Sequence, residues 1–457
     1  TQMEHGQNDR HPEMNAAFSF SRTGLALVGG AVLFLAGCAE PEVILPGERE
    51  DIRPIAEERL AADFSGNTAR AIRLPRQTSN AEWTQGQGTP AYRVSHPALG
   101  SAPALAWSAP IGSGDSRRQR ITAAPVVAQG LVFTLDSAAR VSAVTRDGAL
   151  AWSADLTPPE DDEGQATGGG MAYNDGTLYV SSGYGLLTAL DAATGQQRWQ
   201  QQLDATGSGQ PTVYKGMIYL VAGDDTGWAI KTKDGRIAWQ VSGTPSVANV
   251  LGAPAPALTP DLAIFAFGSG DLMATFRRGG LRRWFASVAG RRTGRAQALI
   301  MDVTGSPVVA GNRVYAGNHA GRTVAYDLET GDRLWTAREG AMGAVQPAGD
   351  SVFVITDRNQ LVRLDNRDGS TVWAVNLSDL LNPTSRKRGA VYANYGPILA
   401  GGRIVVASND GYLRFFDPED GSLAGSAAVP DGATTAPVVA GGTLYVVSTA
   451  GELHAFR

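Results

Sequence analysis

The chain has 457 residues, of which 43% are hydrophobic and 18% are charged, and it contains 56 glycines. This composition is too apolar for a disordered chain and too rich in glycine for a helical protein. The net charge of −5 argues against a nucleic-acid-binding protein, because such proteins are usually basic.

A secretory signal is expected at the N-terminus. An apolar run from Gly24 to Leu35 follows Arg22 and leads into the tetrad Leu-Ala-Gly-Cys, which ends at Cys38. A charged start, a short apolar core and small residues are typical of a signal peptide, and the run is too short to span a bilayer. The tetrad resembles a bacterial lipobox, which implies cleavage before Cys38 and lipidation of its thiol. We therefore assign residues 1–37 to a signal peptide and its upstream segment; the alternative is a buried cysteine after an apolar stretch.

Residues 38–80 are expected to form the lipidated N-terminus and a flexible tether. This stretch shows no sustained strand or helix period, and it carries four prolines among glutamates and arginines. Ala39 follows the cysteine, whereas an aspartate at that position resembles a signal for retention in the inner membrane. The sequence therefore favours anchoring in the outer membrane, on its periplasmic face.

From about residue 81 the chain repeats one pattern of roughly 47 residues. The copy from Pro307 to Trp335 shows it clearly: Val, Tyr and Ala alternate with polar residues, and Asp327 precedes Gly331 in a turn. Alternation with a period of two, broken by glycine-containing turns, predicts four short strands per copy. The aspartate caps the turn backbone and the glycine supplies a positive φ, so we assign both a folding role.

Tryptophans mark the outermost strand of most copies. Seven of the nine tryptophans occupy this position, with spacings of 45, 47, 40, 45, 51 and 38 residues: Trp107, Trp152, Trp199, Trp239, Trp284, Trp335 and Trp373. An indole there is large enough to fill the space between adjoining blades, and its N–H can still find an acceptor. Trp83 and Trp228 lie off the pattern, and the copy from Pro397 to Gly421 has no terminal tryptophan.

The last copy begins at Pro437 and stops at Arg457, before its tryptophan strand. The missing strand exists at the other end of the repeat region, as Ala104–Trp107. Pairing the two ends in one blade removes two open sheet edges and closes a ring. We therefore predict an all-β fold over residues 81–457. It is an eight-bladed β-propeller of four-stranded antiparallel blades, with the N-terminal strand closing the last blade.

The sequence offers little catalytic or metal-binding chemistry. Cys38 is the only cysteine, so no disulfide can form within the chain. His96, His319 and His454 are isolated from further ligands, and the remaining two histidines precede the cleavage site. The carboxylates fall mostly one per repeat in the turns. We therefore predict no catalytic residue, no metal site and no cofactor.

Two charged features stand apart from the repeat. Glu160–Glu163 forms an acidic loop after the first full copy. Arginines gather around the outer strand of the fourth blade: Arg277, Arg278, Arg282, Arg283, Arg291, Arg292 and Arg295. Such groups are usually solvated faces, and the alternative is a docking patch for an acidic partner or for anionic headgroups.

The glycine-containing Asp turns and terminal tryptophans resemble those of the PQQ-like quinoprotein propeller superfamily. With the lipobox, the tether and eight blades, the chain resembles the BamB family of propeller lipoproteins from the outer-membrane β-barrel assembly machinery. The likeness covers about residues 100–457 and is strongest in Ala104–Trp107, Gly112–Gly114, Thr304–Asp327 and the last two blades.

This resemblance implies a non-enzymatic scaffold that binds the periplasmic POTRA domains of the barrel-forming subunit and assists delivery of nascent outer-membrane proteins. In the family, partner contacts lie on two neighbouring loops, one with a Leu-x-Leu-Arg pattern and one with Asp-x-Asp. The first falls here on Asn249–Gly252, with Val250 and Leu251 but no arginine, and the second on Asp302–Thr304, with one carboxylate of two. The hypothesis is that Arg282 and Arg283 replace the missing loop arginine. The alternative is that both loops are connectors.

Two other functions remain open. A PQQ-dependent dehydrogenase would use the same propeller, but those enzymes carry an adjacent cysteine pair over the cofactor, which a chain with one cysteine cannot supply. A lipoprotein propeller could instead bind another envelope ligand, such as peptidoglycan or an exported peptide. Blade edges could capture extended substrates by β-augmentation in that case or in the BamB case.

Overall fold

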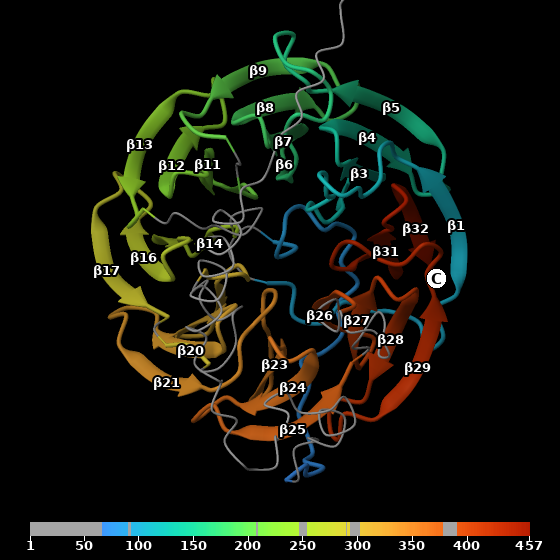
Figure 1. The fold of residues 1–457 in the computed structure, drawn as a ribbon, viewed down its shortest axis with the longest axis vertical. Coiled ribbons are helices and arrows are strands. Elements are labelled where there is room, and N and C mark those ends of the chain that lie inside the picture. The colour runs from blue at the N-terminus through green and yellow to red at the C-terminus, as the bar shows by residue number, and fades with distance from the viewer. Residues whose placement is uncertain are drawn as a thin grey trace, which may run out of the picture. The chain divides into compact units, whose positions relative to one another are not determined.

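The computed structural model describes residues 66–89, 93–206, 209–245, 254–288, 290–292, 302–377 and 391–457. Eight four-stranded antiparallel sheets follow one another around a ring (Figure 1). No helix occurs in the described ranges. The predicted all-β, eight-bladed propeller is therefore confirmed.

Each blade takes its four strands from one stretch of the chain, except the last. The first four blades are, in order, β2 (Val126–Ala128), β3 (Leu131–Leu135), β4 (Arg140–Thr145) and β5 (Leu150–Asp155); β6 (Gly169–Asn174), β7 (Thr177–Ser182), β8 (Leu186–Asp191) and β9 (Gln197–Gln202); β10 (Thr212–Tyr214), β11 (Met217–Val221), β12 (Thr226–Lys231) and β13 (Ile237–Ser242); β14 (Ala257–Leu258), β15 (Leu262–Ala266), β16 (Asp271–Phe276) and β17 (Arg282–Ser287). The last four are β18 (Val308–Ala310), β19 (Arg313–Asn318), β20 (Arg322–Asp327) and β21 (Arg333–Ala337); β22 (Gln346–Ala348), β23 (Ser351–Ile355), β24 (Gln360–Asp365) and β25 (Thr371–Asn376); β26 (Asn394–Ala400), β27 (Arg403–Ser408), β28 (Tyr412–Phe416) and β29 (Leu423–Ala428); β30 (Val438–Ala440), β31 (Thr443–Val447), β32 (Glu452–Phe456) and β1 (Leu105–Pro110).

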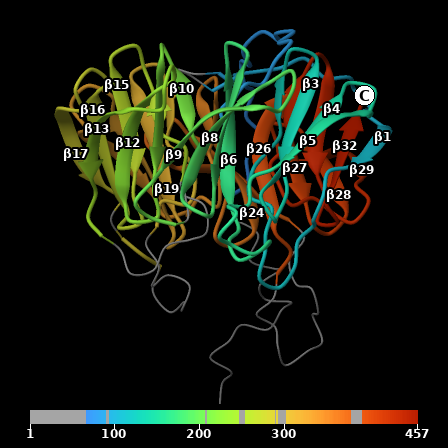
Figure 2. The ribbon, with the colours of Figure 1, turned by 90° about the horizontal axis from the view of Figure 1, so that it is seen from above.

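The first strand of each blade lies toward the central axis and the fourth forms the outer rim (Figure 1). Since neighbouring strands are antiparallel, the turns between first and second and between third and fourth strands share one side of the ring. We call this side the turn face. The other turns and the connections between blades lie on the opposite side, the loop face; Figure 2 shows the ring from its edge. Middle strands such as β7 are buried throughout, whereas outer strands such as β9 are partly exposed, because each middle strand packs between two neighbouring blades.

The repeated tryptophans join each blade to the next. Every one of the seven indole N–H groups donates to a main-chain carbonyl in the third-to-fourth-strand turn of the following blade, at 2.8–3.2 Å. Each ring also covers the glycine of that turn. Gly421, for example, has φ of +77°, and a Cβ there would lie 2.8 Å from the ring of Trp373. The tryptophan and the turn glycine are therefore one inter-blade contact.

In blade 7 the position of the repeated tryptophan is occupied by Gly425. Gly425 lies opposite Phe415 of the neighbouring strand, just as Trp373 in blade 6 lies opposite Arg363. The following blade explains the difference. Its third-to-fourth-strand turn is replaced by the two chain ends of the propeller, where Ala104 and Arg457 exchange main-chain hydrogen bonds of 2.8 and 2.9 Å. Because blade 8 has no continuous turn that could accept an indole, the boundary between blades 7 and 8 has no tryptophan.

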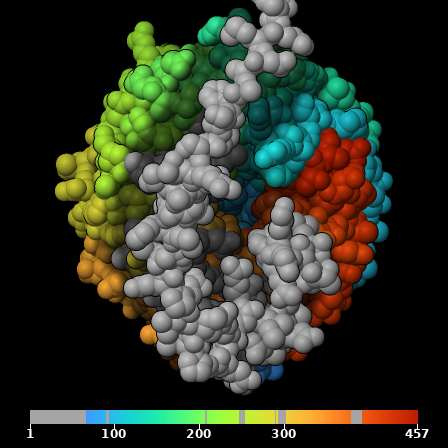
Figure 3. Space-filling model, viewed as in Figure 1, coloured from blue at the N-terminus to red at the C-terminus, as the bar shows by residue number. Residues whose placement is uncertain are grey.

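Ring closure follows the prediction from the sequence. The strand β1 pairs with β32 and completes the order β1-β32-β31-β30. Figure 3 shows the C-terminal residues directly beside those of β1 and blade 1. The fully buried His454 of β32 lies opposite Ser108 of β1, with its Nδ1 atom 2.7 Å from the Ser108 hydroxyl. One histidine thus contributes to the seam that closes the ring.

We expect this seam to weaken in acid. Burial lowers the pKa of His454, and the nearby Glu452 carboxylate only partly opposes the shift. When the pKa of a histidine is lower in the folded state than in the unfolded state, the residue does not affect stability above about pH 6.5. Below that value the unfolded state binds the proton more readily, so the free energy of unfolding decreases as the pH falls. The free energy of unfolding, measured by urea titration from pH 7.5 downward, should fall less steeply in His454→Gln than in the native protein. Equal slopes would contradict this role.

We call residues 66–99 the N-terminal strap; its described residues, 66–89 and 93–99, lie over the turn face. The strap begins on the outer edge of blade 6, where the Thr68 N–H donates to the Val372 carbonyl at 3.1 Å. The Asn67 side chain donates to the Ala374 carbonyl at 3.0 Å and accepts the Ala374 N–H at 2.9 Å. These contacts satisfy main-chain groups of β25 that otherwise face solvent.

The strap then enters the end of the central channel. Trp83 is buried, and its main chain exchanges two 2.8 Å hydrogen bonds with Val127 of β2. The Thr84 carbonyl accepts the Tyr173 N–H of blade 2 at 2.7 Å. The Gln85 amide extends the same pattern into blade 3. The strap therefore pairs with the inner strands of three successive blades.

Further along, the strap reaches the opposite side of the ring. The Gln87 amide donates to the Pro307 carbonyl ahead of β18 at 2.6 Å. The Arg93 guanidinium donates to Gln346 Oε1 of blade 6 at 3.0 Å and to the Pro397 carbonyl of blade 7 at 2.9 Å. The strap thus occupies the centre of the ring at the turn face, where the N-terminal residues appear in blue in Figure 1.

These contacts show that the part of the chain bound to the propeller begins earlier than the sequence predicts. The sequence places a flexible tether as far as residue 80, but residues 67–80 are hydrogen-bonded to blades 6, 7 and 8. The attachment uses side-chain amides and isolated main-chain groups, which leave no period in the sequence. The strap also lies outside the period of the repeat, which is why Trp83 does not fit the tryptophan spacing.

Candidate functional site

The loop between β17 and β18 is held at both ends on the loop face. The Arg292 N–H donates to the Ala320 carbonyl at 2.7 Å, and the His319 N–H donates to the Asp302 carbonyl at 3.1 Å. The two ends of this loop therefore attach to consecutive residues of blade 5. Residues 293–301 between them lie outside the described ranges.

A buried asparagine strengthens this base. The Asn318 amide donates to the carbonyls of Val288 and Gly290 at 3.0 and 3.1 Å, and its oxygen accepts the Arg322 N–H at 2.8 Å. Val303 also forms a β-bridge with Asn318. A fully satisfied and fully buried amide fixes one conformation of the surrounding backbone, so both ends of the loop have a rigid base.

The loop between β13 and β14 ends beside the first. The Gly243 N–H donates to the Asp225 carbonyl at 2.8 Å where this loop begins. Where it ends, the Ala255 N–H donates to the Ser306 hydroxyl at 2.9 Å, four residues after Asp302. The ends of the two predicted partner-binding loops are thus neighbours. Val250 and Leu251 themselves lie outside the described residues.

An ionic cluster joins this base to blade 6. Arg292 donates to Asp357 at 2.9 Å and lies 3.4 Å from Glu339, which accepts from Arg358 at 2.7 Å. The side chains of Asp357 and Glu339 are only 7% and 11% exposed, so solvent screens these pairs less than surface pairs. The hydrogen bond from Arg292 to Asp357 raises the pKa of the guanidinium. The cluster fixes the loop end by charged groups from two blades.

Asp302, on the second of the two loops that the resemblance implies for partner contact, is a buried residue. The residue is 4% exposed. Its main-chain contact with His319 indicates a role in shaping the loop. Burial lowers the pKa of His319, with the Asp357 charge opposing the shift, so this histidine is neutral at pH 7.

One exposed side chain beside this base is a large apolar one. Met342, in the connection from β21 to β22, is 40% exposed, and its N–H is tied to the Ile355 carbonyl at 2.9 Å. The neighbouring Ala341 carbonyl accepts the Thr304 hydroxyl, which brings this connection against the β17–β18 loop. An exposed methionine on a fixed backbone is well suited to bind a partner. Met342 is not predicted as a site residue from the sequence, because its only signal there is its position between Gly340 and Gly343.

Arg282 and Arg283 lie away from this site. They begin β17 on the turn face, where Arg282 pairs with Thr275, whereas the β17–β18 loop follows the other end of the strand. Because Arg282 and Arg283 lie at the opposite end of β17 from the loop, the hypothesis that they replace its missing arginine is wrong. The loop itself contains Arg291, Arg292 and Arg295, and the guanidinium of Arg292 is held by two carboxylates.

The described ranges contain no group of His, Cys, Asp and Glu side chains arranged to hold a metal ion. Within the same ranges, no helix is long and apolar enough to cross a membrane. The features that the structure does offer on the loop face are the adjoining ends of two loops, a rigid base and the exposed side chain of Met342. This arrangement is suited to binding a protein.

Comparison with known proteins agrees with the sequence resemblance. The family model described as "Outer membrane protein assembly factor BamB" matches residues 137–375 and 381–457. The proteins of that name from Yersinia pestis and Escherichia coli K12 are each 25% identical, over 362 and 358 residues. These matches cover 78% and 77% of this chain and 89% and 88% of the relatives.

Solved structures show the fold more widely. BamB from Moraxella catarrhalis superimposes with a TM-score of 0.64 at 17% identity, covering 78% of this chain and 100% of its own. A europium-containing methanol dehydrogenase gives 0.62 at 13% identity, with coverage of 82% and 98%. These likenesses show the propeller alone, because an assembly factor and an enzyme share it. The family model, in contrast, extends over more than half of the sequence: the chain belongs to the family of the outer membrane protein assembly factor BamB.

Proposed function

We propose that this protein is a non-enzymatic assembly factor for outer-membrane proteins and that it acts as a binding platform. Its family and the name its relatives carry support this role. The partner we propose is the barrel-forming subunit of the assembly machinery, bound through its POTRA domains, with nascent outer-membrane proteins as further clients.

One observation supports the loop face as the contact surface. The ends of the two loops expected to bind the partner are joined by the hydrogen bond from Ala255 to Ser306. Met342 lies at the same base, and the ionic cluster around Arg292 joins this base to blade 6. A fixed backbone that presents an apolar side chain loses little entropy on binding, which favours a protein partner at this site.

We further propose that the protein is anchored to the periplasmic face of the outer membrane through lipidated Cys38. The stretch from residue 39 to the strap would then serve as the tether. Fully extended, its 27 residues would reach roughly 90 Å, which leaves the propeller free to orient either face toward a partner.

The dehydrogenase alternative has less support. The only cysteine, Cys38, lies outside the propeller, and the strap occupies the centre of the ring at the turn face. The relatives that match most of the chain are named assembly factors. A propeller that binds some other envelope ligand remains the second candidate, and the same partner-capture experiment separates the two.

The test is co-purification of the full-length chain from crosslinked membranes. We expect recovery of the barrel-forming subunit, a reduction of about tenfold in Met342→Glu, and loss of membrane association in Cys38→Ala. A charge buried in an apolar contact costs roughly 1–3 kcal/mol or more, which corresponds to such a reduction. Leu150→Glu is the matched control, because Leu150 is 58% exposed on the rim of blade 1, outside the proposed surface. Recovery of no assembly subunit with the native chain would contradict the function.

A further inference from the structure

Blade 4 departs from the repeat at the turn between β16 and β17. In four other blades the residue that ends the third strand, or directly follows it, is an aspartate whose carboxylate accepts N–H groups of the turn: Asp191, Asp327, Asp365 and Asp417. Blade 4 has Phe276 at this position, eight residues before its tryptophan, followed by Arg277 and Arg278. Phe276 is 36% exposed and caps nothing. Blades 1 and 3 end the same strand with Thr145 and Lys231, so blade 4 is distinguished by an aromatic side chain at this position that is followed by two arginines.

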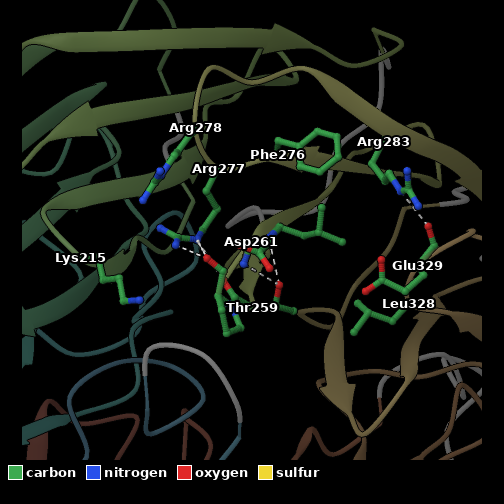
Figure 4. A pocket seen from close by; sticks show the side chains of 11 residues that line it. Lys215, Thr259, Asp261, Phe276, Arg277, Arg278, Arg283, Leu328 and Glu329 are labelled. Carbon is green, nitrogen blue, oxygen red and sulfur yellow. Dashed lines mark hydrogen bonds between the residues drawn. The ribbon is translucent and has the colours of Figure 1, made fainter.

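Phe276 lines an open pocket of about 520 Å³ on the turn face (Figure 4). The pocket is predominantly cationic, with four basic side chains and two carboxylates in its wall: Lys215, Arg277, Arg278 and Arg283, and Asp261 and Glu329. None of the four cations forms an ion pair with a residue of the described ranges. The pocket therefore carries positive charge that the described chain does not neutralise.

The contacts of two arginines show how this charge is presented. The Arg277 guanidinium donates to the carbonyls of Thr259 and Pro260, and it lies 4.6 Å from the ring centre of Tyr214. Arg283 donates to the Glu329 main-chain carbonyl at 3.1 Å. Both guanidinium groups thus rest on neutral acceptors, which position them without cancelling their charge.

The outer edge of blade 4 continues this surface. Phe285 of β17 is 45% exposed, and Leu281, which precedes the strand, is 71% exposed. No strand pairs with the outer side of β17 in the described ranges. An open strand edge with exposed apolar side chains can accept an added strand from a partner.

Blade 6 shows how such an edge is covered in this same protein. Thr68 and Asn67 of the strap pair with Val372 and Ala374 of β25, and the Ala374 N–H points outward to Asn67. The strap then places Arg70 on Asp365, at 2.6 Å. An extended segment on the outer edge therefore reaches the turn of the same blade and pairs with its charge.

The positions of blade 4 correspond one by one, counted from the tryptophans. Arg283 stands at the position of Val372, Phe285 at that of Ala374, and Phe276 at that of Asp365. A segment lying on β17 as the strap lies on β25 would reach the cationic pocket, where blade 6 has an acidic turn. The charge that fits this pocket is negative.

We propose that the outer edge of blade 4 binds an extended acidic segment of a partner protein, which adds a strand to β17 and places its carboxylates among Arg278, Arg283 and Lys215. This surface lies on the turn face and the rim, and it adds a second contact to the function proposed above. Because the loop-face variants do not touch it, the two proposals can fail separately.

The test uses a synthetic peptide of four Glu-Val repeats, capped at both ends, and its Lys-Val counterpart. We expect fluorescence anisotropy to show that the full-length chain binds the acidic peptide and not the basic one. The double variant Arg278→Glu/Arg283→Glu should weaken this binding at least about tenfold, because each change turns attraction into repulsion. Lys233→Glu/Arg236→Glu, which makes the same charge change in the exposed turn of blade 3, should leave it nearly unchanged.

Backbone pairing has its own test. By correspondence with Ala374, the Phe285 N–H points outward, so Phe285→Pro removes the donor an added strand needs, while Phe285→Ala removes only the ring. We expect the proline variant to bind the peptide more weakly than the alanine variant. Equal binding of the two peptides, unchanged binding by the double arginine variant, or binding only to phosphatidylglycerol vesicles would overturn the proposal.

Discussion

Replacing Trp373 with alanine should lower the free energy of unfolding by about 3–5 kcal/mol. Trp373 is fully buried, packs against Phe353 with ring centres 5.8 Å apart, and covers Gly421 of the next blade. Its N–H donates to the Pro418 carbonyl at 3.2 Å. The change therefore opens a cavity between two blades and removes one of the two donors to the Pro418 carbonyl, the other being Arg363 at 3.1 Å.

Urea titration of the native chain, Trp373→Ala and Trp373→Phe measures this effect. The phenylalanine variant keeps much of the packing and loses the hydrogen bond, so its loss should be smaller, about 1–2 kcal/mol. Trp152→Ala, at a half-buried copy of the same position, should lose less than Trp373→Ala. A loss under about 1 kcal/mol in Trp373→Ala would show that the tryptophans do not hold the blades together.

Deleting residues 66–99, with the tether joined directly to Gly100, should destabilise the propeller by at least about 3 kcal/mol while leaving β1 in place. Burial of Trp83 alone accounts for a loss of this size. The deletion also removes the partners of main-chain groups in several inner strands, among them Val127 and Tyr173. We therefore expect the strap to act as a second closure of the ring, in addition to the pairing of β1 with β32.

Hydrogen–deuterium exchange gives the local readout. The Val127 and Tyr173 amides, which donate to Trp83 and Thr84, should exchange much faster in the deletion variant than in the native chain. Amides in the middle strand β27 should change far less, because they pair within their own blade. Unchanged exchange at Val127 and Tyr173 would show that the strap does not seal the channel.

The repeated part of this fold could be predicted because each blade repeats the same local requirements. The tryptophan spacing sets the blade boundaries, and the turn glycines follow from contact with those rings. The closure by Ala104–Trp107 was predictable because Arg457 ends the last copy one strand early. Even the absence of a tryptophan in blade 7 has a local cause, since the next blade has no continuous turn.

The strap and the site could not be predicted in the same way. Contacts such as Gln87 with Pro307 or Arg93 with Pro397 join residues more than 200 positions apart and follow no period. Arg283 and Arg292 are close in the sequence but lie near opposite ends of β17. Arg283 is therefore on the turn face and Arg292 on the loop face, a difference that their spacing in the sequence does not show. Asp302 is buried, and a single carboxylate in a sequence gives no sign of burial.

The most direct measurement places a photo-crosslinking amino acid at residue 342 on the loop face or at residue 150 on the rim of blade 1, in the full-length chain within membranes. Both side chains are exposed, at 40% and 58%, so the two positions are matched in access to a partner. We predict a crosslink from position 342 to the POTRA region of the barrel-forming subunit and none from position 150. Equal crosslinking from both positions, or none to that subunit from position 342, would contradict the loop face as the platform through which this propeller acts.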